Sequence, residues 1–159
     1  MNAADPRTVS ESIHIEADPE PEVMETLFAA APLVQERMTV LTEGVEMLAF
    51  LFTDDFQVDP VDAAKVLTPD ASVTLEAALE ALDDITAWEA GAIENALRAA
   101  LVDKLGLMPK NAFAPVRVAV TGRRVSPPLF ESLDLLGADR TLSRLRAAID
   151  QIAAVSTRA

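Results

Sequence analysis

Apolar side chains recur at steps of three and four residues along most of this chain, and that spacing places them on one face of an α-helix. The first such stripe consists of Met24, Leu27, Phe28, Ala31, Val34, Met38, Leu41, Val45, Leu48 and Phe52. Pro32 interrupts it. Since proline is tolerated in the first turn of a helix, we predict a short helix from Met24 and a second helix beginning near Pro32. The sequence TDDF, residues 53–56, is expected to end the second helix.

The amino-acid composition also favours helices over sheets. Half of the 159 residues are hydrophobic, which is enough to bury a core, and alanine and leucine are abundant. Glycine occurs only 5 times, aromatic residues make up 4% and tyrosine is absent, whereas strands favour β-branched and aromatic side chains. Composition and periodicity together predict a helical protein.

Proline residues mark the starts and breaks of further predicted helices. Asp59 is a suitable cap before Pro60, so a short helix is expected from there to Leu67. Residues 68–70, with the sequence TPD, form the next break. The stripe of a following helix consists of Leu75, Ala78, Leu79, Leu82 and Ile85.

Thr86 and Glu89 have the spacing of a capping box and predict the start of a helix that ends at Gly106. Trp88, the only tryptophan, lies in the predicted first turn. We expect it to be an anchor in the core or between helices.

The C-terminal part of the chain contains two more predicted helices. Ser126 and Pro127 are expected to cap and open a helix that ends at Gly137. A last helix is predicted from about Asp139 to Ala154. Its inward residues are Leu142, Leu145, Ile149 and Ile152, and its largely outward residues are Arg140, Arg144 and Arg146.

The segment VRVAVT, residues 116–121, is ambiguous between strand and helix. Alternating valines favour a strand, whereas Pro115 could open a helix and Gly122 could end it. Local propensity does not decide between the two.

Charge is unevenly distributed along the chain, whose net charge is −13. Residues 1–97 contain 21 acidic and 3 basic side chains, a balance of −18, whereas residues 98–159 contain 5 acidic and 10 basic ones, a balance of +5. Such asymmetry can mark a polyanion-binding face, although ordinary solvated surfaces produce it too.

Most motifs of self-contained catalysis are missing. The chain has no cysteine and one histidine, His14, in a polar stretch, which argues against thiol chemistry, zinc sites and histidine-dependent catalysis. It contains no glycine-rich phosphate loop, no G-x-S-x-G motif and no EF-hand loop. These features favour a helical binding or interaction module over a self-sufficient enzyme.

The N-terminal residues 1–21 are polar, acidic and proline-containing, and are expected to form a mobile tail. This start is not a signal peptide, and no apolar run reaches the roughly 18–20 residues that cross a bilayer. A cytoplasmic location is therefore expected.

The segment KNAFAPVRVAVTGRRVSPPLFESLDLLGADRTLSRL, residues 110–145, resembles the C-terminal anticodon-binding region of bacterial, actinobacterial-type glutamyl-tRNA synthetases. The string R-x-A-x-T-G followed by S-P-P-L-F-E-x-L-x-x-L-G carries the resemblance. The upstream block APLVQERMTVL, followed by FLF, resembles the preceding helical subdomain of that family. The similarity covers residues from about 23 to 155.

This resemblance implies an all-α, multihelical cage of two small α-subdomains that binds the anticodon loop of glutamate tRNA. Residues 1–21 would be the acidic tail, 22–58 part of the first helical subdomain and 59–159 the C-terminal one, with VRVAVT helical. The HIGH-like and KMSKS-like motifs of the family's catalytic domain do not occur in the chain. ATP and magnesium would belong to that domain, so no cofactor, metal or catalytic residue is expected here.

The resemblance also implies roles for individual residues. Arg37, in QERMTVL, matches the family arginine that reads the last anticodon base, and Arg117, in PVRVAVTG, matches the one placed against the first two bases. Ser126, Pro127 and Leu129 match the turn and helix start that pack around those bases.

Three further cations, Lys110, Arg123 and Arg124, are expected to be neighbours of RNA phosphates.

Two questions stay open at this point. The chain could be a fragment of a synthetase or a free-standing relative that pairs with a catalytic domain. It could alternatively be a helical adaptor that keeps the fold but docks a protein, for example through its arginine-bearing last helix.

Overall fold

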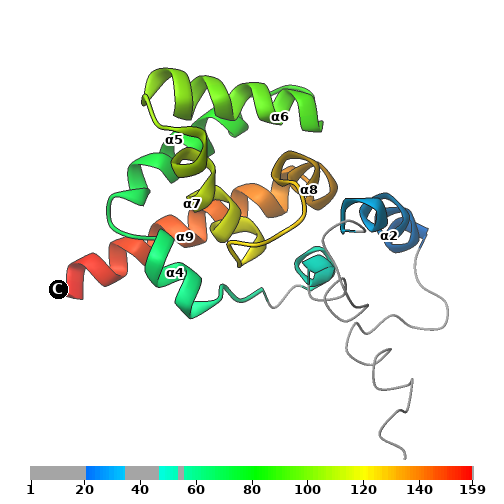
Figure 1. Cartoon of the computed structure of the whole chain (residues 1–159), viewed down its shortest axis with the longest axis horizontal. Coiled ribbons are helices and arrows are strands. Elements are labelled where there is room, and N and C mark those ends of the chain that lie inside the picture. Colours follow the sequence, from blue (N-terminus) through cyan, green and yellow to red (C-terminus); the bar gives the residue numbers. More distant parts are fainter. Residues whose placement is uncertain (1–20, 35–46, 54–55, 159) are drawn as a thin grey trace, which may run out of the picture.

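The computed structural model describes residues 21–34, 47–53 and 56–158, and all regular secondary structure in these ranges is helical (Figure 1). The elements are α2 (Pro21–Val34), the 3-10 turn η1 (Ala49–Leu51), α4 (Pro60–Val66), α5 (Ala71–Asp83), α6 (Ala90–Leu97), the π-helix η2 (Arg98–Lys104), α7 (Pro109–Thr121), α8 (Leu129–Leu136) and α9 (Ala138–Arg158). The predicted all-α fold is confirmed. None of the helices in these ranges is both long and apolar enough to cross a lipid bilayer.

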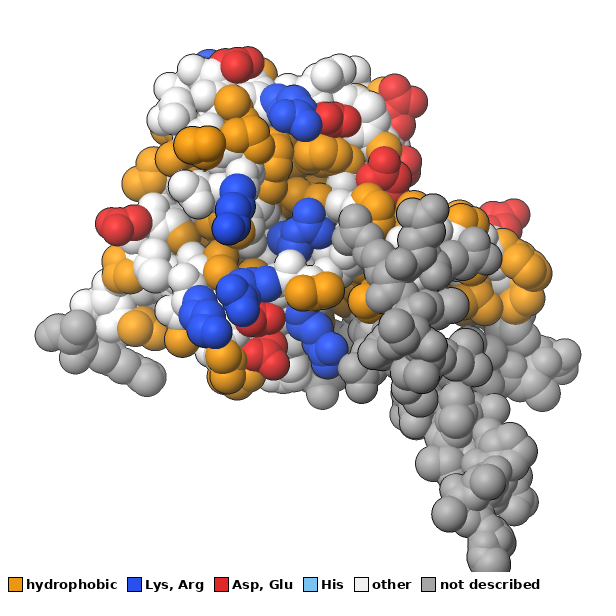
Figure 2. All heavy atoms as spheres, viewed as in Figure 1, with side chains coloured by type: hydrophobic (Ala, Val, Ile, Leu, Met, Phe, Trp, Pro, Cys, Tyr) orange, Lys and Arg blue, Asp and Glu red, His pale blue; other side chains and the backbone are white. Residues whose placement is uncertain are grey.

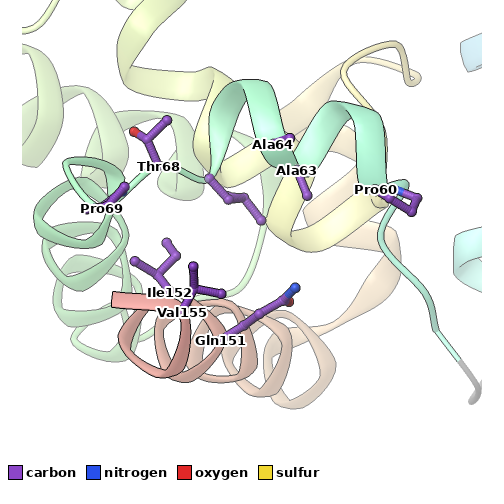
Figure 3. A pocket seen from close by; sticks show the side chains of 9 residues that line it. Pro60, Ala63, Ala64, Thr68, Pro69, Gln151, Ile152 and Val155 are labelled. Carbon is purple, nitrogen blue, oxygen red and sulfur yellow. The ribbon is translucent and has the colours of Figure 1, made fainter. Parts of the chain in front are cut away.

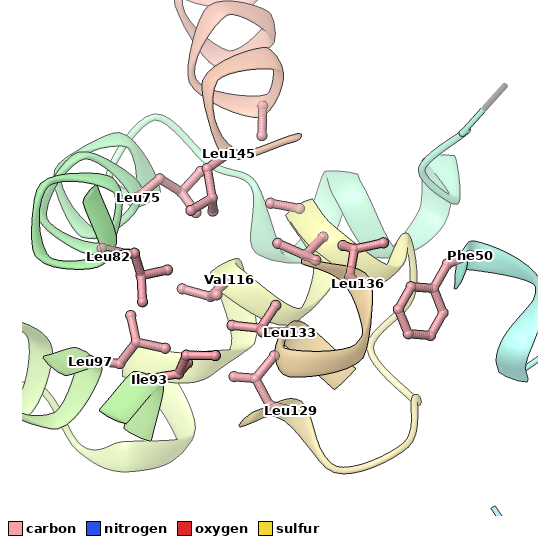
Figure 4. Packing of buried hydrophobic residues seen from close by; sticks show 14 of the residues in the cluster. Phe50, Leu75, Leu82, Ile93, Leu97, Val116, Leu129, Leu133, Leu136 and Leu145 are labelled. Carbon is pink, nitrogen blue, oxygen red and sulfur yellow. The ribbon is translucent and has the colours of Figure 1, made fainter. Parts of the chain in front are cut away.

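Helix α7 is the central element, since it contacts α4, α5, η2, α8 and α9. Figure 4 shows Val116 of α7 among inward-pointing leucines of the surrounding helices. Leu75, Leu97 and Leu133, from α5, α6 and α8, are fully buried in the same cluster. Burial of each such side chain stabilises the fold by roughly 1.5–3 kcal/mol, so packing around α7 determines the architecture.

The ambiguous segment 116–121 is helical, as the family resemblance implies. Val116, Val118 and Val120 are all fully buried. Val116 and Val120 belong to the hydrophobic core cluster, because α7 is surrounded by other helices. The helix begins at Pro109, six residues before Pro115, which lies inside it.

The N-terminal part differs from the prediction at Pro32. This proline does not open a new helix but lies inside α2, which continues to Val34. It falls in the last turn of α2, where it cannot donate to the carbonyl oxygen four residues earlier, and the helix ends two residues later. The predicted second helix lies mostly outside the described residues. Its described end is η1, in which Phe50 and Leu51 are buried.

Two predicted caps have different outcomes. Asp59 caps α4 as expected, because its Oδ1 accepts the backbone N–H groups of Val61 and Asp62 at 2.9 and 3.0 Å. The predicted capping box of Thr86 and Glu89 is wrong, because α6 begins at Ala90 and Glu89 makes no side-chain cap bond.

A contact from α8 replaces the predicted capping box. The backbone N–H of Ala90 donates to Asp134 Oδ2 at 3.1 Å. Trp88 precedes α6 rather than lying in its first turn, and its Nε1–H donates to the carbonyl oxygen of Leu133 at 2.9 Å. The expectation that Trp88 anchors one helix to another is confirmed.

The arginines of α9 correct another expectation. Arg146 is exposed as predicted, but Arg144 is buried and Arg140 is half-buried. Arg144 donates to the carbonyl oxygens of Val120 and Phe50, both at 2.9 Å.

Arg140 likewise donates to carbonyl groups at the end of η1 and just after it. Its Nη1 and Nη2 donate to the carbonyl oxygens of Leu51 and Thr53, both at 2.8 Å. Residues 50–53 contain only a short 3-10 turn, so their carbonyl groups need donors from elsewhere. The two guanidinium groups supply them, which explains why these cations turn inward.

Candidate nucleic-acid interface

Arg117 and the turn between α7 and α8 form one hydrogen-bonded unit. Arg117 Nη1 donates to Ser126 Oγ at 2.6 Å and to the carbonyl oxygen of Pro127 at 3.0 Å. Ser126 and Pro127 are themselves buried. The turn therefore fixes the position of this half-buried guanidinium.

Gly122 allows the chain to turn at the end of α7. Its φ of +85° lies in the left-handed region, which favours glycine. A Cβ at this position would stand 2.9 Å from the carbonyl oxygen of Gln57. Both features require glycine here, and the turn that follows leads back to Ser126 beside Arg117.

Ser126 does not cap α8, so that prediction is wrong. The cap position is Pro128, and the Ser126 hydroxyl donates to the carbonyl oxygen of Pro127 at 2.9 Å. The side chain is thus used inside the turn. Leu129, which opens α8, is 3% exposed and acts mainly as an anchor of the turn in the core.

A groove of about 660 Å³ runs along this unit. Its basic lining residues are Arg98, Lys110, Arg117 and Arg124, and its aromatic ones are Phe113 and Phe130. Figure 2 shows Lys and Arg side chains gathered down the middle of this face, with most Asp and Glu side chains near its edges. Glu131 is an acidic residue on the lining. The groove therefore combines cations with apolar rings, a chemistry suited to RNA.

The groove brings together only some of the residues that the sequence singles out. Lys110, Arg117, Arg124 and Leu129 all line it. Ser126 and Pro127 lie behind Arg117, which they hold in place.

The structure does not place two of the predicted contact residues in the groove. Arg123 is exposed but is not among the residues that line the groove. Arg37 lies outside the described residues.

Sequence patterns alone do not single out Arg98, Phe113 and Phe130, because these residues come from three different helices. The rings of Phe113 and Phe130 are perpendicular, with their centroids 5.3 Å apart. The guanidinium carbon of Arg98 lies 5.5 Å from the centroid of Phe113 and 6.0 Å from that of Phe130. Only the folded chain places them side by side.

Arg124 is held at the groove by Asp62 of α4. Its Nε donates to Asp62 Oδ1 and its backbone N–H donates to Asp62 Oδ2, both at 2.9 Å. The backbone N–H of Arg124, followed by its guanidinium, lowers the pKa of Asp62 below its usual value although burial opposes this. The stabilisation of the fold by the Asp62–Arg124 pair is therefore fully present above the usual carboxyl pKa. It is lost only as pH falls through the lowered pKa of Asp62. At neutral pH Arg124 stays paired.

Since the sequence predicts that these cations bind RNA, replacing Asp62 by asparagine is expected to strengthen that binding by about two- to threefold, because it removes a negative charge beside the groove and releases the Arg124 side chain. Gel-shift titrations at neutral pH would measure the change. Glu76→Gln, which removes an exposed carboxylate on α5, is the matched control and should bind like the wild type. Weaker binding by Asp62→Asn than by Glu76→Gln would show that Asp62 orients Arg124 productively.

A second groove, of about 380 Å³, lies between α4 and the end of α9 (Figure 3). Its lining includes Ala63, Leu67, Ile152 and Val155 and no charged side chain. This surface offers nothing to a polyanion. Within the described ranges, no three His, Asp or Glu side chains converge in a way that could hold a metal ion.

Comparison with known protein sequences identifies the family that this chain resembles in the sequence analysis. The family model described as an anticodon binding domain matches residues 8–149. A glutamate–tRNA ligase of Acidothermus cellulolyticus is 59% identical over 124 residues, which are 77% of this chain and 25% of that protein. The ligase of Rhodococcus jostii is 57% identical over 129 residues, 79% of this chain and 26% of that protein.

The solved structures agree on the fold. A glutamate tRNA ligase from Elizabethkingia meningosepticum superposes with a TM-score of 0.71 at 19% identity and covers 92% of this chain and 28% of its own. The chain spans about a quarter of the length of the curated relatives that it matches. None of these comparisons supports the alternative of a protein-interaction adaptor.

Proposed function

Because the chain belongs to the anticodon binding domain family, and is homologous to the C-terminal region of glutamate–tRNA ligases, we propose that it binds the anticodon loop of glutamate tRNA. The observation that carries this proposal is the position of Arg117 on the wall of a cationic groove, where Ser126 and Pro127 hold it.

The chemistry of the groove suits unpaired nucleotides. Loop bases expose hydrogen-bonding edges and flat faces, and arginine offers a fork of donors together with a flat cation. In this proposal Arg117 reads the first two anticodon bases. Ser126, Pro127 and Leu129 shape the turn against which these bases pack, and Arg37 reads the third base.

The remaining cations have a less specific role in the proposal. Lys110, Arg123 and Arg124 contact phosphates and position the loop without reading its sequence. The activation of glutamate, with ATP and magnesium, takes place on a catalytic domain that these residues do not form. A cytoplasmic location goes with this function.

Charge sets the expected strength of binding by the isolated chain. The basic groove belongs to a protein with a net charge of −13, whose acidic residues repel the RNA backbone. Three phosphate contacts on a single-stranded loop imply a log–log salt slope of about −2, or about 15-fold weaker binding between roughly 50 and 200 mM salt.

A filter-binding titration of the full chain with glutamate tRNA, and with the same tRNA carrying a changed anticodon, tests the proposal. We expect tighter retention of glutamate tRNA and weaker binding of both RNAs as salt rises. Equal retention of the two RNAs, or binding that ignores salt, would rule out a specific anticodon reader.

A further inference from the structure

Arg98 and two phenylalanines form a flat, cationic surface at the η2 end of the groove. The guanidinium of Arg98 lies over Phe113 at 5.5 Å, and Phe130 supports the pair from the side through its perpendicular contact with Phe113. Nearly half of the Arg98 side chain, 47%, is exposed. One side of this group is therefore packed on aromatic rings while much of it faces the groove.

Glu94 pairs with Arg98 at the edge of this surface. Its Oε1 accepts a hydrogen bond from Arg98 Nε at 2.8 Å, one helical turn away. The carboxylate accepts the Nε–H in the plane of the guanidinium, so this bond does not cover the faces of that plane. The face of the guanidinium opposite the aromatic rings can therefore take a stacked group.

We propose that Arg98, supported by Phe113 and Phe130, is a stacking platform for one unpaired base of the bound RNA loop. This proposal rests on the anticodon-binding function and adds a contact that is separate from Arg117. A planar cation above aromatic rings stacks on the face of any base, so this contact adds affinity with little sequence preference.

The experiment uses the full chain and RNA hairpins with the anticodon stem and loop of glutamate tRNA, each carrying 2-aminopurine at one loop position. Stacking quenches the fluorescence of this base analogue, whereas a phosphate contact does not. We expect strong quenching at one loop position with the wild type and loss of that quenching in Arg98→Ala. Loss of one stacked base weakens binding by about tenfold.

Two further variants isolate the effect. Arg98→Lys keeps the charge and the Glu94 partner but has no plane, so it should lose the quenching as Arg98→Ala does. Arg146→Ala removes an exposed arginine of α9 outside the groove and should behave as the wild type. Circular dichroism of all variants establishes that they keep their helices.

The outcomes separate this proposal from the one it rests on. If the hairpin binds with anticodon preference but Arg98→Lys quenches as the wild type does, or no loop position is quenched, the platform is overturned and the anticodon-binding function stands. If the wild type does not bind the hairpin, both proposals fail.

Discussion

Arg144→Ala is expected to lower the free energy of unfolding by about 3 kcal/mol, because it leaves buried carbonyl groups without donors. The guanidinium bonds the carbonyl oxygens of Val120 at the end of α7 and Phe50 in η1. It also lies 4.0 Å from the centroid of the Phe56 ring. Arg144 therefore joins three segments that are far apart in the sequence.

Urea denaturation followed by circular dichroism measures this effect. Arg146→Ala, two residues along α9 and exposed, is the matched control and should change stability by less than about 0.5 kcal/mol. Arg144→Lys should fall between the two, because one ammonium group cannot replace both arms of a guanidinium. An Arg144→Ala protein as stable as Arg146→Ala would show that the buried contacts contribute nothing.

Arg117→Ala is expected to reduce the preference for the glutamate anticodon by about 5- to 150-fold, the equivalent of about 1–3 kcal/mol for a bidentate base contact. The guanidinium is the group that we place against the bases, and Ser126 and Pro127 hold it in position. The ratio of dissociation constants for hairpins with the glutamate anticodon and with a changed anticodon measures the preference.

Two variants serve as controls for Arg117. Arg117→Lys keeps the charge and should retain the salt dependence of binding while losing the preference. Arg123→Ala removes a proposed phosphate contact and should weaken both hairpins equally, with the ratio unchanged. An unchanged ratio in Arg117→Ala, in a protein of normal helicity, would remove Arg117 from base recognition.

The sequence predicts those parts of the fold that depend on local chemistry. Asp59 and Pro60 start α4 where expected, because a cap and a first-turn proline act within one helical turn. The ends of α7 and α8 are also local, since Gly122 and Gly137 both have positive φ. Residues 116–121 are different, because only burial on all sides explains a helix rich in valine.

Long-range contacts account for two of the wrong predictions. The start of α6 is set by Asp134, which is 44 residues away and cannot be recognised from the spacing of Thr86 and Glu89. The helical stripe predicts Arg144 on the surface. Its buried acceptors, Phe50 and Val120, are 94 and 24 residues distant.

The candidate site also has one part that the sequence predicts and one part that only the packing of the helices reveals. Arg117 and Ser126 are nine residues apart and occur in one recognisable string, so the family resemblance places them in one site, and the structure brings them together. Arg98, Phe113 and Phe130 have no common string, because η2, α7 and α8 each contribute one of them. Such a cluster can be found only from the packing of the helices.

The most direct test of the proposed interface is an NMR titration that follows the side-chain Nε–H signals of the arginines while the glutamate anticodon hairpin is added. We predict that the Arg117 signal shifts strongly with this hairpin and much less with an anticodon-changed one, while the Arg146 signal stays in place. A hairpin that binds without moving the Arg117 signal would contradict the proposal that this groove reads the anticodon.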